Sequence, residues 1–201
     1  MLESAFTLFD APVTWLEIAA FVLSVICVSL NIKEVHWAWP FTIAASALYS
    51  WLFFANKLYG DGTLQFVFIA SAFYGWWQWL FGTRSADEKK PFTPQYLRRK
   101  KWPFLALSWL ILWLAIGLFL KRFTDTDVPW WDAFPTAGSL VATYLLAKKY
   151  VENWPIWIGV NAVGAALFAY KNLTLTAMLY AIFLAMAAVG WRAWHKIARR
   201  S

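Results

Sequence analysis

The sequence predicts an all-α membrane protein of seven transmembrane helices, arranged as two triplets with one extra helix between them. Two observations lead to this prediction: an unusually apolar composition and an internal repeat. Of the 201 residues, 61% are hydrophobic and 14% are charged, and the mean hydropathy is +0.51. Soluble domains have about 45–50% apolar and about 25% charged residues. This chain cannot cover its surface with polar groups, so a bilayer is the solvent that fits it.

Seven apolar segments are long enough to form transmembrane helices, which need about 20 mostly apolar residues. They cover residues 13–30, 38–55, 62–82, 103–120, 130–147, 153–170 and 173–192. No strands are expected. Gly60, Asp61 and Gly62 indicate a turn before the third segment. The one long polar connection, residues 84–101, contains Pro91 and is expected to be a loop.

The distribution of Lys and Arg predicts the orientation, because positively charged loops stay in the cytoplasm. With the N-terminus outside and the C-terminus inside, fourteen of the 18 Lys and Arg residues fall on the cytoplasmic side. The net charge of +7 therefore reflects membrane topology, and no nucleic-acid partner is expected. The basic cluster Arg98–Lys101 is expected to contact anionic membrane lipid. His36 and His195 are expected to lie outside the spans.

An internal repeat appears when the chain is overlaid on itself with an offset of 115 residues. Among the matches are Trp15 with Trp130, Glu17 with Asp132, Trp39-Pro40 with Trp154-Pro155, and Gly75-Trp76 with Gly190-Trp191. Matches of Trp, Pro and acidic residues at one offset carry information, whereas Leu and Ala match often by chance. The repeat indicates that the chain arose by duplication.

Each copy of the repeat contains three spans, and the segment 103–120 has no counterpart. Because this extra span reverses the chain, both copies run in the same direction across the membrane. We therefore expect a 3+1+3 architecture: residues 1–82 form the first triple-helix repeat, 83–129 the cytoplasmic loop and linker helix, and 130–201 the second repeat with a basic C-terminal tail. Parallel repeats are a transporter design in which the substrate lies near the midplane, here between the two triplets.

Polar residues at membrane depth need a protein or substrate partner. Asn161 lies near the middle of the segment 153–170, and its repeat partner is Ser46. Such an Asn can clamp neighbouring helices or orient the hydroxyl groups of a ligand, and the transporter architecture favours the ligand. Tyr49 reaches a comparable depth. Tyr144 offers a hydroxyl in the segment 130–147, as do Ser139 and Thr143, although Ser and Thr often bond back to their own helix.

A polar and aromatic stripe runs along the third span, and its repeat counterpart runs along the seventh. At 100° per residue, Gln65, Trp76 and Trp79 share one face. The offset places Tyr180, Trp191 and Trp194 on the matching face. For Trp79 and Trp194, packing and ligand contact remain equally open. The predicted substrate-binding residues are Ser46, Tyr49, Gln65, Trp76, Tyr144, Asn161, Tyr180 and Trp191.

Several motifs resemble those of the PnuC family of vitamin transporters. They are WLE at 15–17, LYGDGTLQ at 58–65, YGWWQW at 74–79, WWDA at 130–133 and KKYVENWPIW at 148–157. The resemblance covers essentially the whole chain. It implies a seven-helix core similar in plan to the SWEET sugar transporters, and a homotrimer. It also implies uptake of nicotinamide riboside across the bacterial inner membrane by facilitated diffusion, with intracellular phosphorylation trapping the substrate. Relatives carry thiamine or riboflavin.

The charged residues agree with a neutral or singly charged vitamin. No Arg or Lys lies deep in a span, which disfavours anionic substrates, including phosphorylated nucleotides. The only acids in spans, Glu17 and Asp132, are shallow, so a uniporter without ion coupling is expected. These two acids either tie the loops at the interface, which we favour, or attract a cationic substrate.

Other classes fit less well. A membrane enzyme needs a nucleophile with a base, or a metal cluster, and Cys27 with two distant His residues supplies neither. No enzymatic activity, metal or cofactor is therefore expected. A retinal protein needs a Lys in its last span, and residues 172–191 contain none. A non-transporting membrane scaffold remains an alternative.

Overall fold

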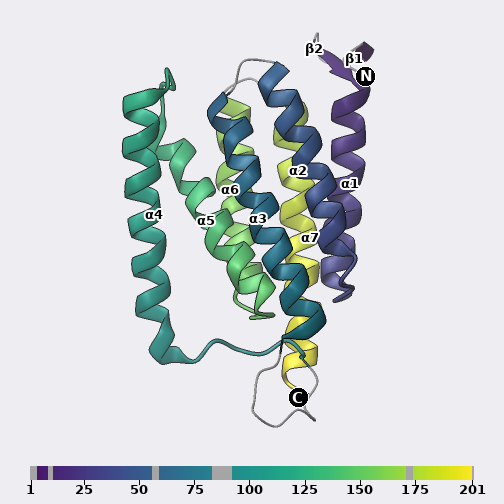
Figure 1. The fold of residues 1–201 in the computed structure, drawn as a ribbon, viewed down its shortest axis with the longest axis vertical. Coiled ribbons are helices and arrows are strands. Elements are labelled where there is room, and N and C mark those ends of the chain that lie inside the picture. The colour runs from purple at the N-terminus through teal and green to yellow at the C-terminus, as the bar shows by residue number, and fades with distance from the viewer. Residues whose placement is uncertain (1–3, 9–10, 56–58, 83–91, 171–173, 201) are drawn as a thin grey trace. The chain divides into compact units, whose positions relative to one another are not determined.

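The computed structural model describes residues 4–8, 11–55, 59–82, 92–170 and 174–200. Within these ranges the chain forms seven α-helices, one short 3-10 helix and one β-hairpin (Figure 1). The helices divide into two compact units, Met1–Phe81 and Gly82–Ser201. The seven predicted helices are thus all present, and each unit is described by itself.

The first unit is a triplet of helices preceded by a hairpin. Its elements are β1 (Ser4–Leu8), β2 (Ala11–Thr14), α1 (Trp15–Ile32), α2 (Ala38–Ala55) and α3 (Tyr59–Phe81). Helix α2 packs against both α1 and α3. The strands pair antiparallel, with Leu8 opposite Ala11. The expectation of no strands was wrong here, because a segment rich in Thr, Val and Phe favours strands and satisfies its backbone groups locally by pairing.

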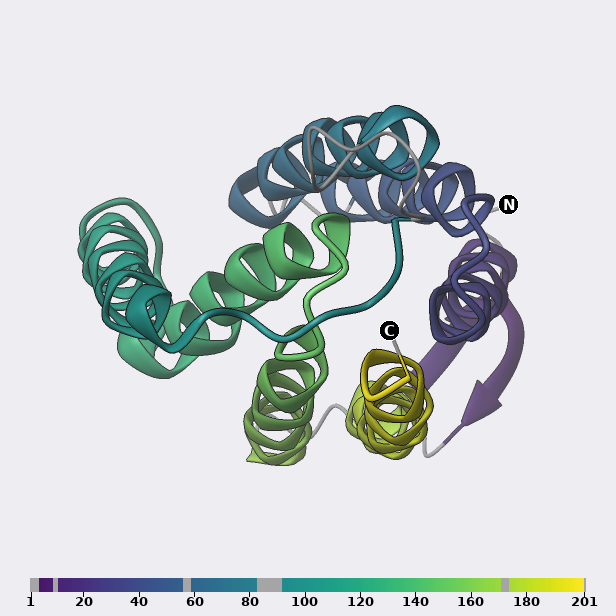
Figure 2. The ribbon, with the colours of Figure 1, turned by 90° about the horizontal axis from the view of Figure 1, so that it is seen from below.

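The second unit contains four helices. Its elements are η1 (Arg99–Lys101), α4 (Trp102–Phe123), α5 (Pro129–Ala147), α6 (Asn153–Tyr170) and α7 (Thr174–Ala198). Helix α5 packs against α4 and α6, and α6 packs against α7. Seen from below, α4 stands beside α5 at the edge of this unit (Figure 2). A proline opens both α4 and α5, where the missing N–H costs nothing because the first turn has no intrahelical acceptor.

The predicted boundaries need two corrections. Helix α3 begins at Tyr59, so Gly60, Asp61 and Gly62 lie in its first turn rather than in a separate turn. The cost of about 1 kcal/mol for each Gly is outweighed by the long apolar run that follows. Helix α7 continues to Ala198, so His195 lies inside the helix. By length and composition, two stretches of the described chain can cross a membrane, Arg99–Phe123 and Ala177–Ala198.

The same tryptophan pair occurs in both units. In the first, Trp39 of α2 meets Trp79 of α3 edge to face, with ring centroids 5.4 Å apart and planes at 89°. In the second, Trp154 of α6 meets Trp194 of α7 at 5.5 Å and 88°. Edge-to-face pairs add about 0.5–1.5 kcal/mol beyond the area they bury. The two pairs differ by 115 in both residue numbers, as do both ends of α2 and α6.

A glycine receives the large ring of each inner tryptophan. A Cβ atom built on Gly75 would lie 2.3 Å from the Trp39 ring, and one on Gly190 would lie 2.6 Å from the Trp154 ring. Trp39 and Trp154 are almost completely buried. The third helix of each triplet therefore approaches the middle helix as closely as it does because glycine has no side chain at that position.

Candidate functional site

A buried polar residue occupies the middle of α2 in the first unit, and another occupies the middle of α6 in the second. Ser46 in α2 is 7% exposed, and Asn161 in α6, 115 positions later, is 5% exposed. Within the described part of the chain, neither side chain makes a hydrogen bond to protein. A hydroxyl can donate one hydrogen bond, and an amide can donate two and accept two. These two positions therefore hold unused hydrogen-bonding capacity at the depth where the sequence predicts substrate.

A phenol ring lies near this level in each unit, but it comes from a different helix. In the first unit, Tyr49 belongs to the middle helix α2, and the half-buried Gln65 belongs to α3. In the second, Gly164 takes the place of Tyr49, and Tyr180 of α7 takes the place of Gln65.

The exchange is visible in the packing of α6 against α7. A Cβ atom on Gly164 would lie 2.4 Å from the Tyr180 ring, so the glycine makes room for that ring. Tyr180 also contacts Phe168, with centroids 5.0 Å apart. The two copies thus keep one phenol each while differing in the helix that carries it.

The tryptophans of the predicted stripes separate into two kinds. Trp79 and Trp194 pack edge to face on the inner tryptophans, and Trp194 is fully buried, which favours packing over ligand contact. Trp76 is half-buried, and its indole N–H has no acceptor within the described residues. Its counterpart Trp191 is 44% exposed. Trp77, between Trp76 and Trp79 in the sequence, is exposed.

Helix α5 uses its hydroxyls locally. Ser139 donates to the carbonyl of Pro135 at 2.8 Å, and Thr143 donates to that of Ser139 at 2.7 Å. This back-bonding is what the sequence analysis expected of Ser and Thr. Tyr144 is 53% exposed. Of the polar residues on α5, Tyr144 alone stays a candidate for ligand contact.

The two shallow acids, Asp132 and Glu17, are described to different extents. Thr126 donates a hydrogen bond from its hydroxyl to the Asp132 carboxylate, and the Asp132 amide donates to the carbonyl of Val128 at 3.0 Å. Asp132 therefore ties the α4–α5 loop to the start of α5, which agrees with the interpretation we favoured. Glu17 lies in the first turn of α1, and its side chain is outside the described part of the chain.

Gln78 is one of several buried polar residues that were not assigned from the sequence. Gln78 in α3 is buried and engaged by protein partners. Its repeat counterpart is Ala193, so the offset drew no attention to it. The signal that was available was an amide set within a run of tryptophans, where apolar residues are expected.

Comparisons with known proteins agree with one another. A family model described as nicotinamide mononucleotide transporter matches residues 14–196. The riboflavin/roseoflavin transporter RibM of Streptomyces davaonensis is 29% identical over 199 residues, covering 98% of this chain and 92% of the relative. The nicotinamide riboside transporter PnuC of Escherichia coli is 27% identical over 214 residues, covering 92% and 87%.

A solved structure matches as well. The crystal structure of the vitamin B3 transporter PnuC superimposes with a TM-score of 0.75 at 24% identity, covering 92% of this chain and 83% of that one. At this identity the match establishes the fold. The helical architecture is therefore shared with a known transporter.

Proposed function

The chain belongs to the nicotinamide mononucleotide transporter family, the PnuC family of membrane transporters, and we propose that it takes up nicotinamide riboside by facilitated diffusion. Phosphorylation inside the cell then traps the substrate. The protein works as a uniporter in the bacterial inner membrane, with the N-terminus outside, the C-terminus in the cytoplasm and three copies in the assembly. The orientation rests on the distribution of Lys and Arg, and the homotrimer rests on the family resemblance.

The observation that carries this proposal is the pair Ser46 and Asn161. Both are buried at mid-helix, and neither has a hydrogen-bond partner within the described residues. A riboside offers ribose hydroxyls and a carboxamide, which match a hydroxyl and an amide. Its pyridinium ring is a cation that aromatic faces attract, and Trp76 and Tyr180 would supply such faces. That the substrate binds between the two triplets remains a prediction.

The recurring contacts support a duplicated 3+1+3 plan. A nicotinamide riboside molecule has a ring at one end and a sugar at the other, so it needs a site whose two halves differ. The exchange of Tyr49 and Gln65 for Gly164 and Tyr180 supplies such a difference within an otherwise repeated scaffold.

The charges argue against the mononucleotide itself as substrate. A phosphate is bound best by Arg or Lys. Lys149 is the only buried cation in the described ranges, and it lies in the turn after α5 with its ammonium 5.5 Å from the Phe92 ring centroid. We therefore expect the riboside to bind at least about tenfold more tightly than its phosphate ester, a difference of about 1.4 kcal/mol.

Riboflavin is the second candidate, favoured by the 29% identity to RibM over 98% of the chain. Binding of nicotinamide riboside, nicotinamide mononucleotide, thiamine and riboflavin to the purified protein, measured by calorimetry, separates the candidates. Nanomolar to micromolar binding of riboflavin with none of the riboside would replace the first assignment. If none of the four binds, the scaffold alternative gains.

Replacement of the two polar residues tests the site. We expect Asn161→Leu and Ser46→Ala to weaken binding of the preferred vitamin, Asn161→Leu by about tenfold or more, because an unpaired ligand group is left buried. Ser108→Ala is the matched control, since its exposed hydroxyl only bonds back to Phe104. Unchanged affinity in both variants would refute the site. Uptake into proteoliposomes that requires a proton or sodium gradient would refute the uniport mechanism.

A further inference from the structure

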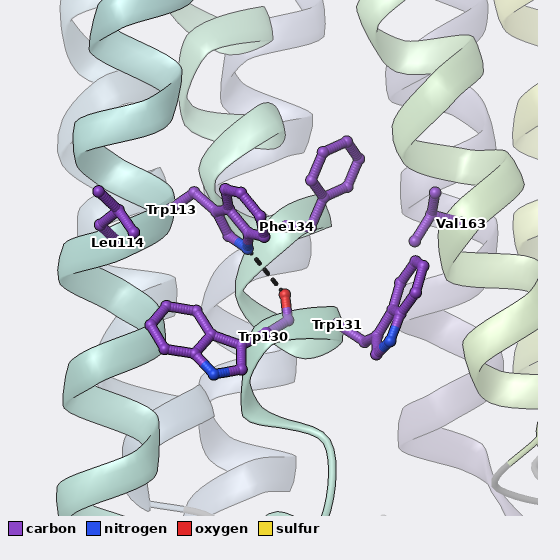
Figure 3. Close-up of a pocket in the computed structure, with 6 residues that line it drawn as sticks. All are labelled: Trp113, Leu114, Trp130, Trp131, Phe134 and Val163. Carbon is purple, nitrogen blue, oxygen red and sulfur yellow. Dashed lines mark hydrogen bonds between the residues drawn. The ribbon is translucent and has the colours of Figure 1, made fainter.

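The second unit carries an open apolar groove that none of the predicted substrate residues lines. It lies where α4, α5 and α6 meet, and its volume is about 700 Å³ (Figure 3). The residues that line it are Trp113, Leu114, Trp130, Trp131, Phe134 and Val163. A second hollow of about 480 Å³ shares Trp131 and Val163 with the first and continues to Tyr170. Ligand pockets typically measure about 300–1,000 Å³, so the groove is large enough to hold a substantial part of a ligand.

The walls of the groove are held in place by protein contacts. The indole N–H of Trp113 donates to the carbonyl of Trp130 at 2.8 Å. The Trp130 ring lies over Gly117, where a Cβ atom would be 2.4 Å away. Trp113 also meets Phe134 edge to face, with centroids 6.0 Å apart. A preformed site spends less free energy on ordering when a ligand enters, so this surface is better suited to retaining a ligand than an ordinary lipid-facing surface.

Charged residues of both signs stand at the end of α4 nearest the groove. Lys121 follows Leu114 by seven residues, which places it on the same helix face about 10 Å further along. Arg122 is next to it, and Asp125 and Asp127 follow in the loop to α5. All four are exposed, and none has an ionic or hydrogen-bonded partner among the described residues.

This combination matches one class of molecule. A phosphodiester binds Lys and Arg through charge-assisted hydrogen bonds, and a primary ammonium group donates to carboxylates. An acyl chain gains about 0.8 kcal/mol for each buried methylene. We propose that the groove between α4, α5 and α6 is a binding site for a phospholipid with an ethanolamine headgroup, which Lys121, Arg122, Asp125 and Asp127 recognise while one acyl chain lies along Trp131 and Val163.

Native mass spectrometry of the purified full-length protein tests this site. After exchange into mixed vesicles of phosphatidylethanolamine and phosphatidylglycerol, each chain is expected to retain one phosphatidylethanolamine. The double variant Lys121→Gln/Arg122→Gln should lower this retention at least fivefold, as should Asp125→Asn/Asp127→Asn. The matched control Lys100→Gln/Lys101→Gln, at the other end of α4, should retain the lipid.

A groove-filling variant tests the acyl-chain part separately. Val163→Phe adds bulk where both hollows meet and should expel the lipid, while the helical circular-dichroism signal stays unchanged. If this variant misfolds, the milder Leu114→Ala serves instead. It removes part of the apolar wall of the groove and should lower lipid retention. Equal retention of both lipids, or full retention in the charge variants, would overturn the proposal. A further combination of results would also overturn the proposal: the wild-type protein retains no lipid, and Val163→Phe loses subunit association. A second copy of the chain would then cover the groove.

Discussion

The turn between α1 and α2 and the turn between α5 and α6 have the same backbone but different surroundings. In the first, Val35 donates to the carbonyl of Leu30 at 3.0 Å and Glu34 donates to that of Asn31 at 3.1 Å. The equivalent bonds in the second turn measure 2.9 Å each. Both are Schellman caps, in which the residue after the helix adopts a left-handed conformation. Glu34 has φ of 58° and Lys149 has φ of 50°, although glycine usually occupies this position.

In the described part of the chain, the second turn receives another segment of its unit. The amide of Gln95 donates to the carbonyl of Lys149, and that of Val151 donates to the carbonyl of Gln95, both at 3.0 Å. The amide of Leu97 donates to both carboxylate oxygens of Glu152 at 3.0 Å. Figure 2 shows the segment before α4 passing under this turn. We call residues 92–98 the docked segment.

The side chains explain why the turns differ. At the position equivalent to Glu152, the first turn has Trp37, which is 54% exposed and offers no carboxylate. The docked segment has a further attachment in the second unit, where the hydroxyl of Tyr96 contacts Nδ1 of His195 in α7. Among the described contacts, the packing of tryptophan on glycine recurs in both units, whereas the bonds to the docked segment are described in the second.

The largest expected effect on stability concerns a contact that both units share, the glycine beneath each inner tryptophan. Gly75→Ala and Gly190→Ala should each lower the free energy of unfolding by about 3 kcal/mol, the upper end for overpacking, because Trp39 and Trp154 are buried and cannot move aside. The midpoint of thermal unfolding in detergent measures the effect. Similar losses in both units would support one repeated folding contact.

Gly159→Ala is the control for these variants. A Cβ atom on Gly159 meets nothing within 4 Å, so the substitution should stabilise α6 slightly through its higher helix propensity, by up to about 1 kcal/mol. A loss in only one of the two tryptophan contacts would show that the units differ at this point as well.

Much of the scaffold could be predicted because its causes are local. The apolar runs identified all seven helices, and α6 has the predicted ends because Asn153-Trp154-Pro155 begins it and its apolar run ends at Tyr170. The offset of 115 also identified the tryptophans that pair in each unit. The first turn of α3 was predicted wrongly because Gly60 and Gly62 have low helix propensity, which the following apolar run overrides.

Contacts between distant segments could not be predicted. The bond from Leu97 to Glu152 joins a backbone amide to a carboxylate 55 positions away, and backbone partners leave no pattern in the sequence. For the candidate site, Ser46 and Asn161 lie at mid-helix and are buried, while their contact with substrate stays a prediction. The repeat did not predict that Trp76 is half-buried while Trp191 is exposed, because equal positions in a repeat do not have equal neighbours.

An intermediate effect is expected when Glu152, whose carboxylate binds the docked segment, is replaced. Glu152→Ala leaves the Leu97 amide without its acceptor, and hydrogen bonds to charged groups contribute about 1.5–3 kcal/mol. Local opening of the docked segment should become about tenfold more frequent, so trypsin should cleave after the exposed residues 98–101 about tenfold faster. Trp37→Ala, at the equivalent position of the other turn, should leave this cleavage rate unchanged. An unchanged rate in Glu152→Ala would mean that the backbone bonds of Gln95 alone hold the segment.

The smallest expected effect on the free energy of unfolding concerns the left-handed residues of the two caps, Glu34 and Lys149. At a left-handed position, glycine removes a backbone strain of roughly 1–2 kcal/mol. It also makes the unfolded chain more flexible, which lowers the free energy of unfolding by about 0.4–1 kcal/mol. At Glu34 and Lys149 the backbone change alone should therefore raise the free energy of unfolding by up to about 1 kcal/mol. In Lys149→Gly this gain is offset by loss of the contact between the Lys149 ammonium and the Phe92 ring, which contributes about 0.5–1 kcal/mol.

The alanine variants at the same two positions isolate the side chains, since alanine keeps the left-handed strain. Lys149→Ala and Glu34→Ala therefore measure what each side chain contributes, and chemical unfolding in mild detergent resolves such differences. If Lys149→Ala leaves the free energy of unfolding unchanged, the Lys149 side chain contributes nothing to the docked segment. The asymmetry between the two turns would then rest on Glu152 and on the backbone bonds of Gln95, with Lys149 serving only to close the helix.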